Sequence, residues 1–219
     1  MKLKFFFLLA LSCITTFTIA QQKPAFWNDI QKFKKKDSLN APAKGGILFI
    51  GSSSFTKWTD LEKVYKDYGA INRGFGGSTL VDVNRYVKDI VFPYQARQVI
   101  IYCGENDIAG GASAVETLDH FASLFTSIRN NQPDVPLAYI SIKQSPSRTK
   151  YSSAFLHANA LIKEFLTHYK ATQFIEVDSK MHNKNGSLRP ELFLSDMLHM
   201  KQPGYDIWIK EITPYLLKN

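Results

Sequence analysis

Short apolar runs recur along the chain, and longer stretches with mixed polar and apolar residues separate them. Five runs have the composition of buried strands, at residues 47–50, 70–71, 98–102, 137–141 and 173–177. Continuous apolar strands that alternate with helices are typical of a parallel sheet covered on both faces. The pattern therefore predicts the α/β class, as a three-layer α/β/α sandwich with a five-stranded, parallel, flavodoxin-like sheet.

Helical spacing appears between these runs. In residues 114–128, apolar residues such as Leu118 and Phe121 recur at spacings of three and four, which is the period of one helix face. Similar patterns predict helices over residues 26–39, 81–91 and 154–169. A last helix is expected after Pro203, ending near residue 217. Ligands of such sheets bind beyond the carboxyl ends of the strands, so the loops that follow the strands are the first place to look for chemistry.

The first 20 residues predict an export signal. Lys2 and Lys4 precede an apolar run at 5–11, and small residues end the stretch at Ala20. The run is too short for the ~20 residues of a membrane span, which argues against an anchor. A lipoprotein cut before Cys13 is a weaker alternative, because the preceding residues match a lipobox poorly. We expect cleavage after Ala20 and a periplasmic or extracellular protein without a stable membrane span.

Cleavage there changes the picture given by composition. Residues 21–219 are expected to form one domain, whose first part, 21–44, is an amphipathic helix and a linker. The full chain has a net charge of +8 and two cysteines, and removing the signal leaves +6 and Cys103 alone. Cys103 lies in an apolar run and is expected to be buried. The remaining basic residues include no motif with interleaved aromatic residues, so we expect no nucleic-acid partner.

The loop after the first strand contains Gly51-Ser52-Ser53-Ser54. A serine at a strand-to-helix turn has the placement of a nucleophile, because the helix N-terminus favours developing negative charge. Serine is also a common helix cap, so this loop alone leaves both interpretations open. The motif G-x-S-x-G is absent, since Phe55 occupies its last position. An ordinary α/β-hydrolase is therefore not indicated.

Three other segments carry polar residues at corresponding places. Residues 72–79 contain Gly74, Gly76 and Gly77, which permit a tight turn with a backbone N–H aimed into a site. Residues 104–107 offer the Asn106 amide, and Asp107 could brace that loop. Asp196 and His199 lie three residues apart, so a carboxylate can orient an imidazole there. No zinc motif occurs, so we expect no metal site.

Together, these segments resemble the SGNH hydrolase family, also called GDSL-type esterases and lipases. The resemblance runs from residue 47 to about residue 208. Gly51-Ser52-Ser53 is similar to the family's first block, which usually reads Gly-Asp-Ser. The second block is matched by residues 72–77. The Gly-x-Asn-Asp block is matched by residues 104–107, and the closing Asp-x-x-His block by residues 196–199, so the blocks follow the family's order.

The resemblance implies a role for five residues and requires no cofactor. Ser53 would be the nucleophile, His199 the general base and later the general acid, and Asp196 the residue that holds the imidazole. The oxyanion hole would combine the backbone N–H of Ser53, the backbone N–H of Gly77 and the side-chain amide of Asn106. Ser52 departs from the family pattern, because a neutral hydroxyl stands where the family usually has a carboxylate.

Residues beside these groups are candidates for the substrate pocket. We expect Ser52, Arg73, Glu105 and Lys143 to contribute to substrate binding, and Arg148 shares the loop of Lys143. The remaining histidines match no block, and we interpret them as structural or surface residues.

No long apolar lid is apparent after the signal. This favours small or polar acyl esters over long-chain lipids. The resemblance, together with export, implies a secreted serine esterase acting on small acyl esters, with acetyl groups on carbohydrates as the first expectation. The alternatives are a lysophospholipase or thioesterase, and a non-catalytic glycan-binding module on the same fold. The expected partner is a small-molecule or glycan ester. Oligomeric state is not indicated by the sequence.

Overall fold

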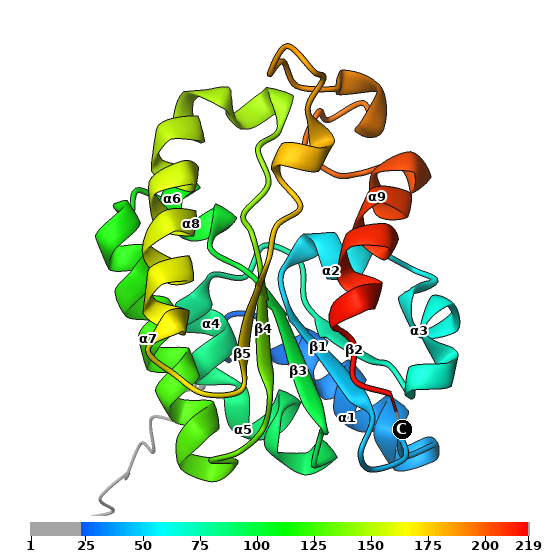
Figure 1. Cartoon of the computed structure of the whole chain (residues 1–219). Helices are drawn as coiled ribbons and strands as arrows, with labels where there is room; N and C mark the ends of the chain where they lie inside the picture. The colour runs from blue at the N-terminus through cyan, green and yellow to red at the C-terminus, as the bar shows by residue number, and fades with distance from the viewer. Residues whose placement is uncertain (1–22, 219) are drawn as a thin grey trace, which may run out of the picture.

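Five parallel strands form the centre of the structure, a computed structural model that describes residues 23–218 (Figure 1). The expected signal at residues 1–20 lies outside the described residues. The strands, in chain order, are β1 (Ile47–Gly51), β2 (Ile71–Gly74), β3 (Gln98–Tyr102), β4 (Leu137–Ile140) and β5 (Thr172–Ile175). Their order in the sheet is β2-β1-β3-β4-β5, and every neighbouring pair is parallel. The predicted flavodoxin-like sheet is confirmed.

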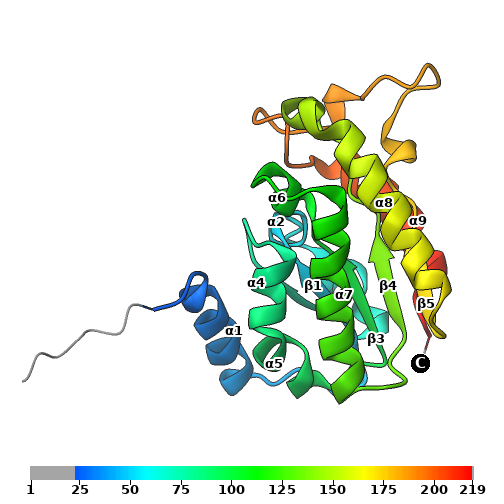
Figure 2. The ribbon, with the colours of Figure 1, turned by 90° about the vertical axis from the view of Figure 1, so that its left-hand side faces the viewer.

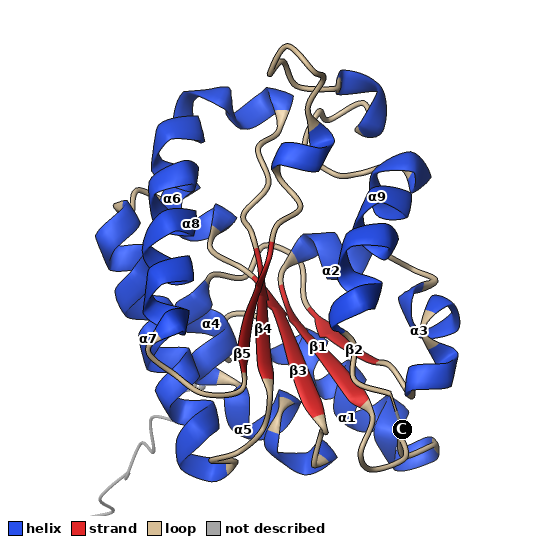
Figure 3. Ribbon diagram, in the orientation of Figure 1, coloured by secondary structure: helices blue, strands red, loops and turns tan. Residues whose placement is uncertain are grey.

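Helices connect the strands and cover both faces of the sheet (Figures 2 and 3). The α-helices of the described residues are α1 (Trp27–Leu39), α2 (Ser53–Lys57), α3 (Leu61–Val64), α4 (Leu80–Arg85), α5 (Val87–Ile90), α6 (Glu105–Ala109), α7 (Ala114–Asn131), α8 (Ser152–Thr167) and α9 (Gln202–Ile212). None of these helices is long and apolar enough to cross a membrane.

Alternation along each strand divides the core into two clusters, because successive side chains of a strand point to opposite faces. Leu48 and Ile50 of β1 join the cluster covered by α1, α4, α5, α7 and α8. Ile47 and Phe49 join the cluster covered by α2, α3 and α9. All five residues of β1 are buried, as the apolar run predicts. Cys103 is also buried, as expected.

Two helices differ from the sequence-based expectation. The helix expected over 81–91 is divided into α4 and α5 at Tyr86, whose φ is −102° and ψ is 11°. Tyr86 is buried and its hydroxyl donates to the Ala25 carbonyl, 2.6 Å away, so its side chain serves the packing of the N-terminal segment. The last helix, α9, ends at Ile212, and a 3₁₀ turn containing Pro214 follows it. Proline cannot continue the hydrogen-bond ladder of an α-helix.

Arg73 of β2 attaches α1 to the sheet. Its guanidinium is fully buried, donates to Asp37 of α1 and to the Tyr94 hydroxyl, and lies over the Phe33 and Tyr94 rings. Glu62 is a more distant carboxylate, 3.8 Å from the guanidinium. A buried cation is costly unless it is paired, so Asp37 stabilises the burial of Arg73.

We expect Asp37→Ala to lower the free energy of unfolding by about 2–3 kcal/mol, because it leaves the buried Arg73 charge without its nearest carboxylate. Urea denaturation measures this loss. Asp29→Ala is the matched control on the same helix, since Asp29 pairs with the exposed Lys32, and exposed pairs contribute at most about 1 kcal/mol. Equal losses in the two variants would contradict the proposed anchoring by Arg73.

Candidate active site

Three strand ends bring the candidate loops together. Gly51 at the end of β1 is in register with Gly74 of β2 on one side and with Tyr102 of β3 on the other. The chain therefore leaves the sheet at three adjacent points, and residues 52–53, 75–78 and 103–106 emerge side by side. This carboxyl edge lies at the top of the strands in Figure 1.

Ser53 is the first residue of α2, and its backbone begins the helix directly after β1. Ser52 is the N-cap, and its carbonyl accepts hydrogen bonds from Phe55 and Thr56. Gly51 has a φ of +138°, which glycine adopts readily. Ser53 is half-buried, whereas Ser52 and Ser54 are buried. Ser53 is thus the only one of the three adjacent serines that is not buried.

The turn after β2 lies against Ser53. A Cβ added at Gly76 would be 3.8 Å from the Ser53 Cβ, so the backbone of this turn approaches the serine closely. Gly77 has a φ of +85°. The buried Ser78 hydroxyl is 2.9 Å from the Phe75 carbonyl oxygen and 3.2 Å from that of Gly51, which holds the turn onto the end of β1.

Two backbone N–H groups face this junction without a partner. Within residues 23–218, no group accepts a hydrogen bond from the N–H of Ser53 or of Gly77. Unpaired N–H groups at neighbouring turns can bind a developing oxyanion. Among the described residues these two N–H groups are therefore free to bind an anionic oxygen.

The Asn106 amide completes this group from the β3 side. Its Nδ2 donates to the Ser52 hydroxyl at 2.8 Å and to the Ser78 carbonyl at 3.0 Å. Its Oδ1 accepts a hydrogen bond from Arg148 at 3.0 Å. The amide group consequently joins the turn that follows β1, at Ser52 beside Ser53, to the turn that follows β2.

Asp107 braces the same loop, as the sequence suggested. Both of its carboxylate oxygens accept from the Leu80 N–H, which begins α4, at 3.0 and 3.2 Å. His120 of α7 lies 2.9 Å from the same carboxylate through its Nδ1. His120 is therefore a structural partner of the loop, and the interpretation of it as a structural histidine agrees with this contact.

Asp196 and His199 meet on the turn that leads into α9. The His199 Nδ1 lies 2.6 Å from the Asp196 carboxylate, and the N–H groups of Leu198 and His199 donate to the other oxygen at 2.9 Å. Burial raises the pKa of Asp196, yet these hydrogen bonds together outweigh burial and lower it to about 2. The carboxylate is thus ionised at neutral pH and can hold the imidazole by one nitrogen, which leaves Nε2 for a substrate or nucleophile.

Helix α9, which follows this turn, packs against α2, the helix that begins with Ser53. The Tyr205 hydroxyl of α9 donates to the Ser54 carbonyl of α2 at 2.9 Å, and the Tyr205 ring stacks on Trp58 with 4.9 Å between ring centroids. Trp208 packs against Phe55 of α2. The helix that begins with Ser53 and the helix that follows His199 are therefore directly bonded to each other.

The structure places the expected pocket residues differently. Ser52 is buried, and its hydroxyl accepts a hydrogen bond from the Asn106 amide, so it braces the site and does not present itself to a substrate. Glu105 and Lys143 are buried against each other, with Lys143 Nζ 3.2 Å from the carboxylate. Arg73 is fully buried beneath α1. All four side chains are buried in this structure, and their part in substrate binding stays a prediction.

These side chains are buried because they point into the molecule. Arg73 shares the β2 face of Ile71, which packs on α1, although its neighbour Gly74 ends the strand at the site. The contacts of Ser78 and Ser147 were not predicted from the sequence. Ser147 donates to the Met197 carbonyl from both its N–H, at 3.0 Å, and its hydroxyl, at 2.9 Å. Their only sequence signal is a polar residue in a strand-exit loop.

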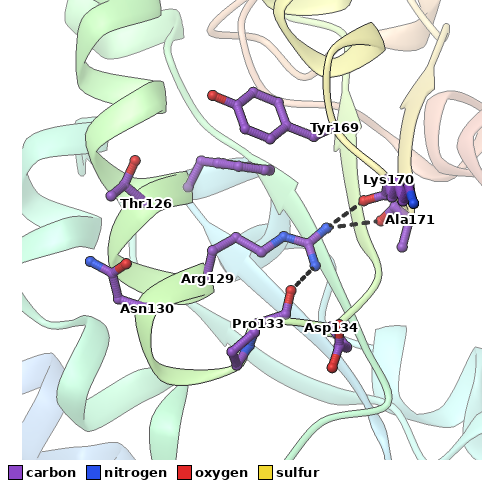
Figure 4. Close-up of a pocket in the computed structure, with 9 residues that line it drawn as sticks. Thr126, Arg129, Asn130, Pro133, Asp134, Tyr169, Lys170 and Ala171 are labelled. Carbon is purple, nitrogen blue, oxygen red and sulfur yellow. Dashed lines mark hydrogen bonds between the residues drawn. The ribbon is translucent and has the colours of Figure 1, made fainter.

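A separate hollow of about 530 Å³ lies at the amino ends of β4 and β5 (Figure 4). It is lined where α7 ends and where β4 and β5 begin. Arg129 crosses it and donates to the carbonyls of Pro133, Lys170 and Ala171. Its guanidinium is thus occupied by main-chain acceptors, at the opposite ends of the strands from Ser53.

Comparisons with known proteins give the family of the chain. The model of the GDSL-like Lipase/Acylhydrolase family matches residues 45–207. No curated protein matched the chain.

Solved structures share the fold. A candidate acylhydrolase from Bacteroides fragilis has 21% identity and a TM-score of 0.76, with 89% of this chain and 98% of that chain covered. A GDSL-like lipase from Bacteroides thetaiotaomicron has 21% identity and a TM-score of 0.70, with 85% and 96% covered. An acetyl-xylooligosaccharide esterase from Geobacillus has 16% identity and a TM-score of 0.62, with 81% and 97% covered.

Proposed function

Because this chain belongs to the GDSL-like lipase/acylhydrolase family and is a carboxylic ester hydrolase, we propose that it is a secreted serine esterase that removes small acyl groups, acetyl above all, from carbohydrates. The observation that carries the catalytic part is the Asp196–His199 pair, with 2.6 Å between the carboxylate and Nδ1, on the turn before a helix that is bonded to the Ser53 helix. Ser53, His199 and Asp196 form the proposed triad.

The proposed reaction uses these groups in sequence. The Ser53 hydroxyl oxygen attacks the ester carbonyl carbon while its proton passes to His199 Nε2. The negative charge that forms on the carbonyl oxygen is bound by the N–H groups of Ser53 and Gly77 and by the Asn106 amide. His199 then gives the proton to the leaving alcohol oxygen, and the acyl group remains on Ser53. Water repeats these steps, releases the acid and restores the serine.

Ser52 is compatible with this chemistry. The Asn106 amide already donates to the Ser52 hydroxyl, and a hydroxyl can exchange its role as acceptor for a role as donor. An oxyanion can therefore accept the hydrogen bond from the Asn106 N–H while the Ser52 hydroxyl turns to another acceptor. A carboxylate at this position would lack that freedom, because it only accepts.

The proposal of a small acyl group rests on two observations. The backbone at Gly76 lies close to the Ser53 side chain, which favours a small acyl group on that side. One structural neighbour is an acetyl-xylooligosaccharide esterase. A panel of p-nitrophenyl esters with graded acyl length, with acetylated xylo-oligosaccharides alongside, tests this. We expect kcat/KM to be highest for acetyl. A preference for long-chain acyl groups, lysophospholipids or thioesters would replace the carbohydrate substrate with those alternatives.

A fluorophosphonate probe tests the catalytic part without knowledge of the substrate. It reacts only with an activated serine, so we expect one label per chain, on Ser53. An unlabelled protein that hydrolyses no ester but binds glycans would favour the non-catalytic binding module.

Replacing Asn106 tests the proposed oxyanion hole. We expect Asn106→Ala to lower kcat by about 10²–10³-fold with a small change in KM, because the amide acts on charge that exists only in the transition state. Steady-state kinetics on p-nitrophenyl acetate measure both constants. Asn130→Ala, on the far side of the molecule at the hollow of Figure 4, is the control. Unchanged kcat in Asn106→Ala would contradict the assignment.

A further inference from the structure

A buried group of charged residues lies behind the Asn106 amide. The Glu105 carboxylate accepts a hydrogen bond from the Tyr102 hydroxyl at 2.8 Å, and it pairs with Lys143 at 3.2 Å and with Arg148 at 3.3 Å. The side chains of Glu105 and Lys143 are buried, and that of Arg148 is 19% exposed. Burial and the Glu105 charge raise the pKa of Tyr102 well above its usual value, so its hydroxyl remains a donor.

The Arg148 guanidinium connects the buried Glu105 carboxylate to the Asn106 amide. One terminal nitrogen, Nη1, pairs with Glu105, and the other, Nη2, donates to the Asn106 Oδ1 at 3.0 Å. A guanidinium is planar and carries its donors in a fixed geometry. When Glu105 fixes one nitrogen, the direction of the other is therefore fixed as well.

This contact determines which way the Asn106 amide faces. With Oδ1 on the guanidinium, Nδ2 must face Ser52 and the Ser78 carbonyl, where the oxyanion hole lies. The reversed amide would set Nδ2 against a cation and Oδ1 against a carbonyl. A charge-assisted hydrogen bond on Oδ1 also polarises the amide, which makes its N–H a stronger donor.

The segment that carries Arg148 is itself held to the other half of the site. Arg148 belongs to the 3₁₀ segment Pro146–Tyr151, and its neighbour Ser147 donates twice to the Met197 carbonyl, between Asp196 and His199. Two consecutive residues thus contact the oxyanion loop and the acid–base turn. The relative position of the two loops depends on this short segment.

We propose that Arg148 is a positioning residue of the esterase, which orients and polarises the Asn106 amide and is held in place by the buried Glu105–Lys143 pair. This inference rests on the proposed function, because its effect is exerted on the oxyanion that Asn106 binds. Arg148 acts through Asn106 and is not required to contact the substrate.

A double-mutant cycle in kcat tests the proposal. We expect Arg148→Ala to lower kcat by about 10–10²-fold, the range typical of a displaced catalytic group, while KM changes less than about 2-fold. In the Asn106→Ala background, the same replacement is expected to change kcat less than about 2-fold, because the group it positions is gone. Independent, additive losses in the two backgrounds would overturn the proposal.

Two further variants show whether the effect of Arg148 comes from its geometry, from its charge or from a loss of folding. Arg148→Lys keeps a cation near Glu105 but lacks the planar fork, so kcat is expected to remain several-fold below that of the unmodified protein. Full activity in Arg148→Lys would show that charge alone suffices and would overturn the positioning role. Lys150→Ala, on the same segment and in contact with the Tyr151 ring, is the control that should retain full activity. Thermal unfolding confirms that each variant is folded.

The outcomes distinguish this inference from the proposed function. No hydrolysis and no fluorophosphonate label in the unmodified protein would overturn the esterase assignment and the positioning role with it. An active, labelled protein whose Arg148→Ala variant keeps its kcat would overturn the positioning role alone. A raised KM with unchanged kcat would make Arg148 a substrate contact and would also overturn it.

Discussion

Ser53→Ala is expected to abolish ester hydrolysis, with kcat lower by about 10⁴–10⁶-fold, because the proposed mechanism has no other nucleophile. The fold should remain intact, since the described structure gives the Ser53 hydroxyl no hydrogen-bond partner to lose. Hydrolysis of p-nitrophenyl acetate measures the loss, and the far-UV circular dichroism and the melting temperature check the fold.

Ser54→Ala is the matched control, one residue further along the same helix. Ser54 is buried, its contact with α9 is made by its carbonyl, which the substitution retains, and its side chain loses only a hydrogen bond with Tyr102, whose hydroxyl still donates to Glu105. We expect activity within a few-fold of the unmodified protein. Undiminished turnover in Ser53→Ala, or a fluorophosphonate label that persists in it, would reassign the nucleophile.

Gly51→Ala is expected to prevent stable folding. A Cβ at Gly51 would lie 1.9 Å from the Tyr102 carbonyl oxygen, and the residue has a φ of +138°. The oxygen cannot move away, because it accepts the Ser52 N–H at 3.0 Å and belongs to the central strand pair β1–β3. The loss in unfolding free energy should exceed about 4 kcal/mol, beyond the range of most single substitutions.

Gly111→Ala separates the steric clash from the backbone strain. Gly111 also has a positive φ, +107°, but an added Cβ would meet nothing within 4 Å. Its substitution should therefore show the strain alone, about 1–3 kcal/mol. Urea denaturation of soluble protein, together with the soluble yield, compares the two variants. Similar losses would show that the approach of β1 to Tyr102 is less restrictive than the geometry indicates.

The sheet was predictable where burial on both faces makes a strand apolar throughout. β1 and β3 are such strands, and their predicted and observed ranges agree to within one residue. β2 was recognised only at its start, because Asn72 and Arg73 are polar. Asn72 bonds to the Phe55 carbonyl, and Arg73 pairs with Asp37. Such pairings depend on partners distant in sequence, which a local pattern does not contain.

The site was predictable at the level of loops and less so at the level of side chains. Because parallel strands end at one edge, the placement of Ser53, Gly77 and Asn106 on neighbouring loops followed from the order of the strands. The pairing of Asp196 with His199 followed from their spacing. The burial of Arg73 and Lys143 against carboxylates could not be predicted, because adjacency in sequence does not state which way a side chain points.

The hydrogen bonds of Arg129 have a consequence for which positions can change in sequence between relatives. The hydrogen bonds of Arg129 go to carbonyl oxygens, at positions 133, 170 and 171. Every residue type supplies a carbonyl, so the contact with Arg129 does not itself restrict the side chains at these three positions. Ala171 is restricted for a different reason, its φ of +54°, which glycine or asparagine would also suit. In an alignment of homologues, we expect an invariant arginine facing a variable loop.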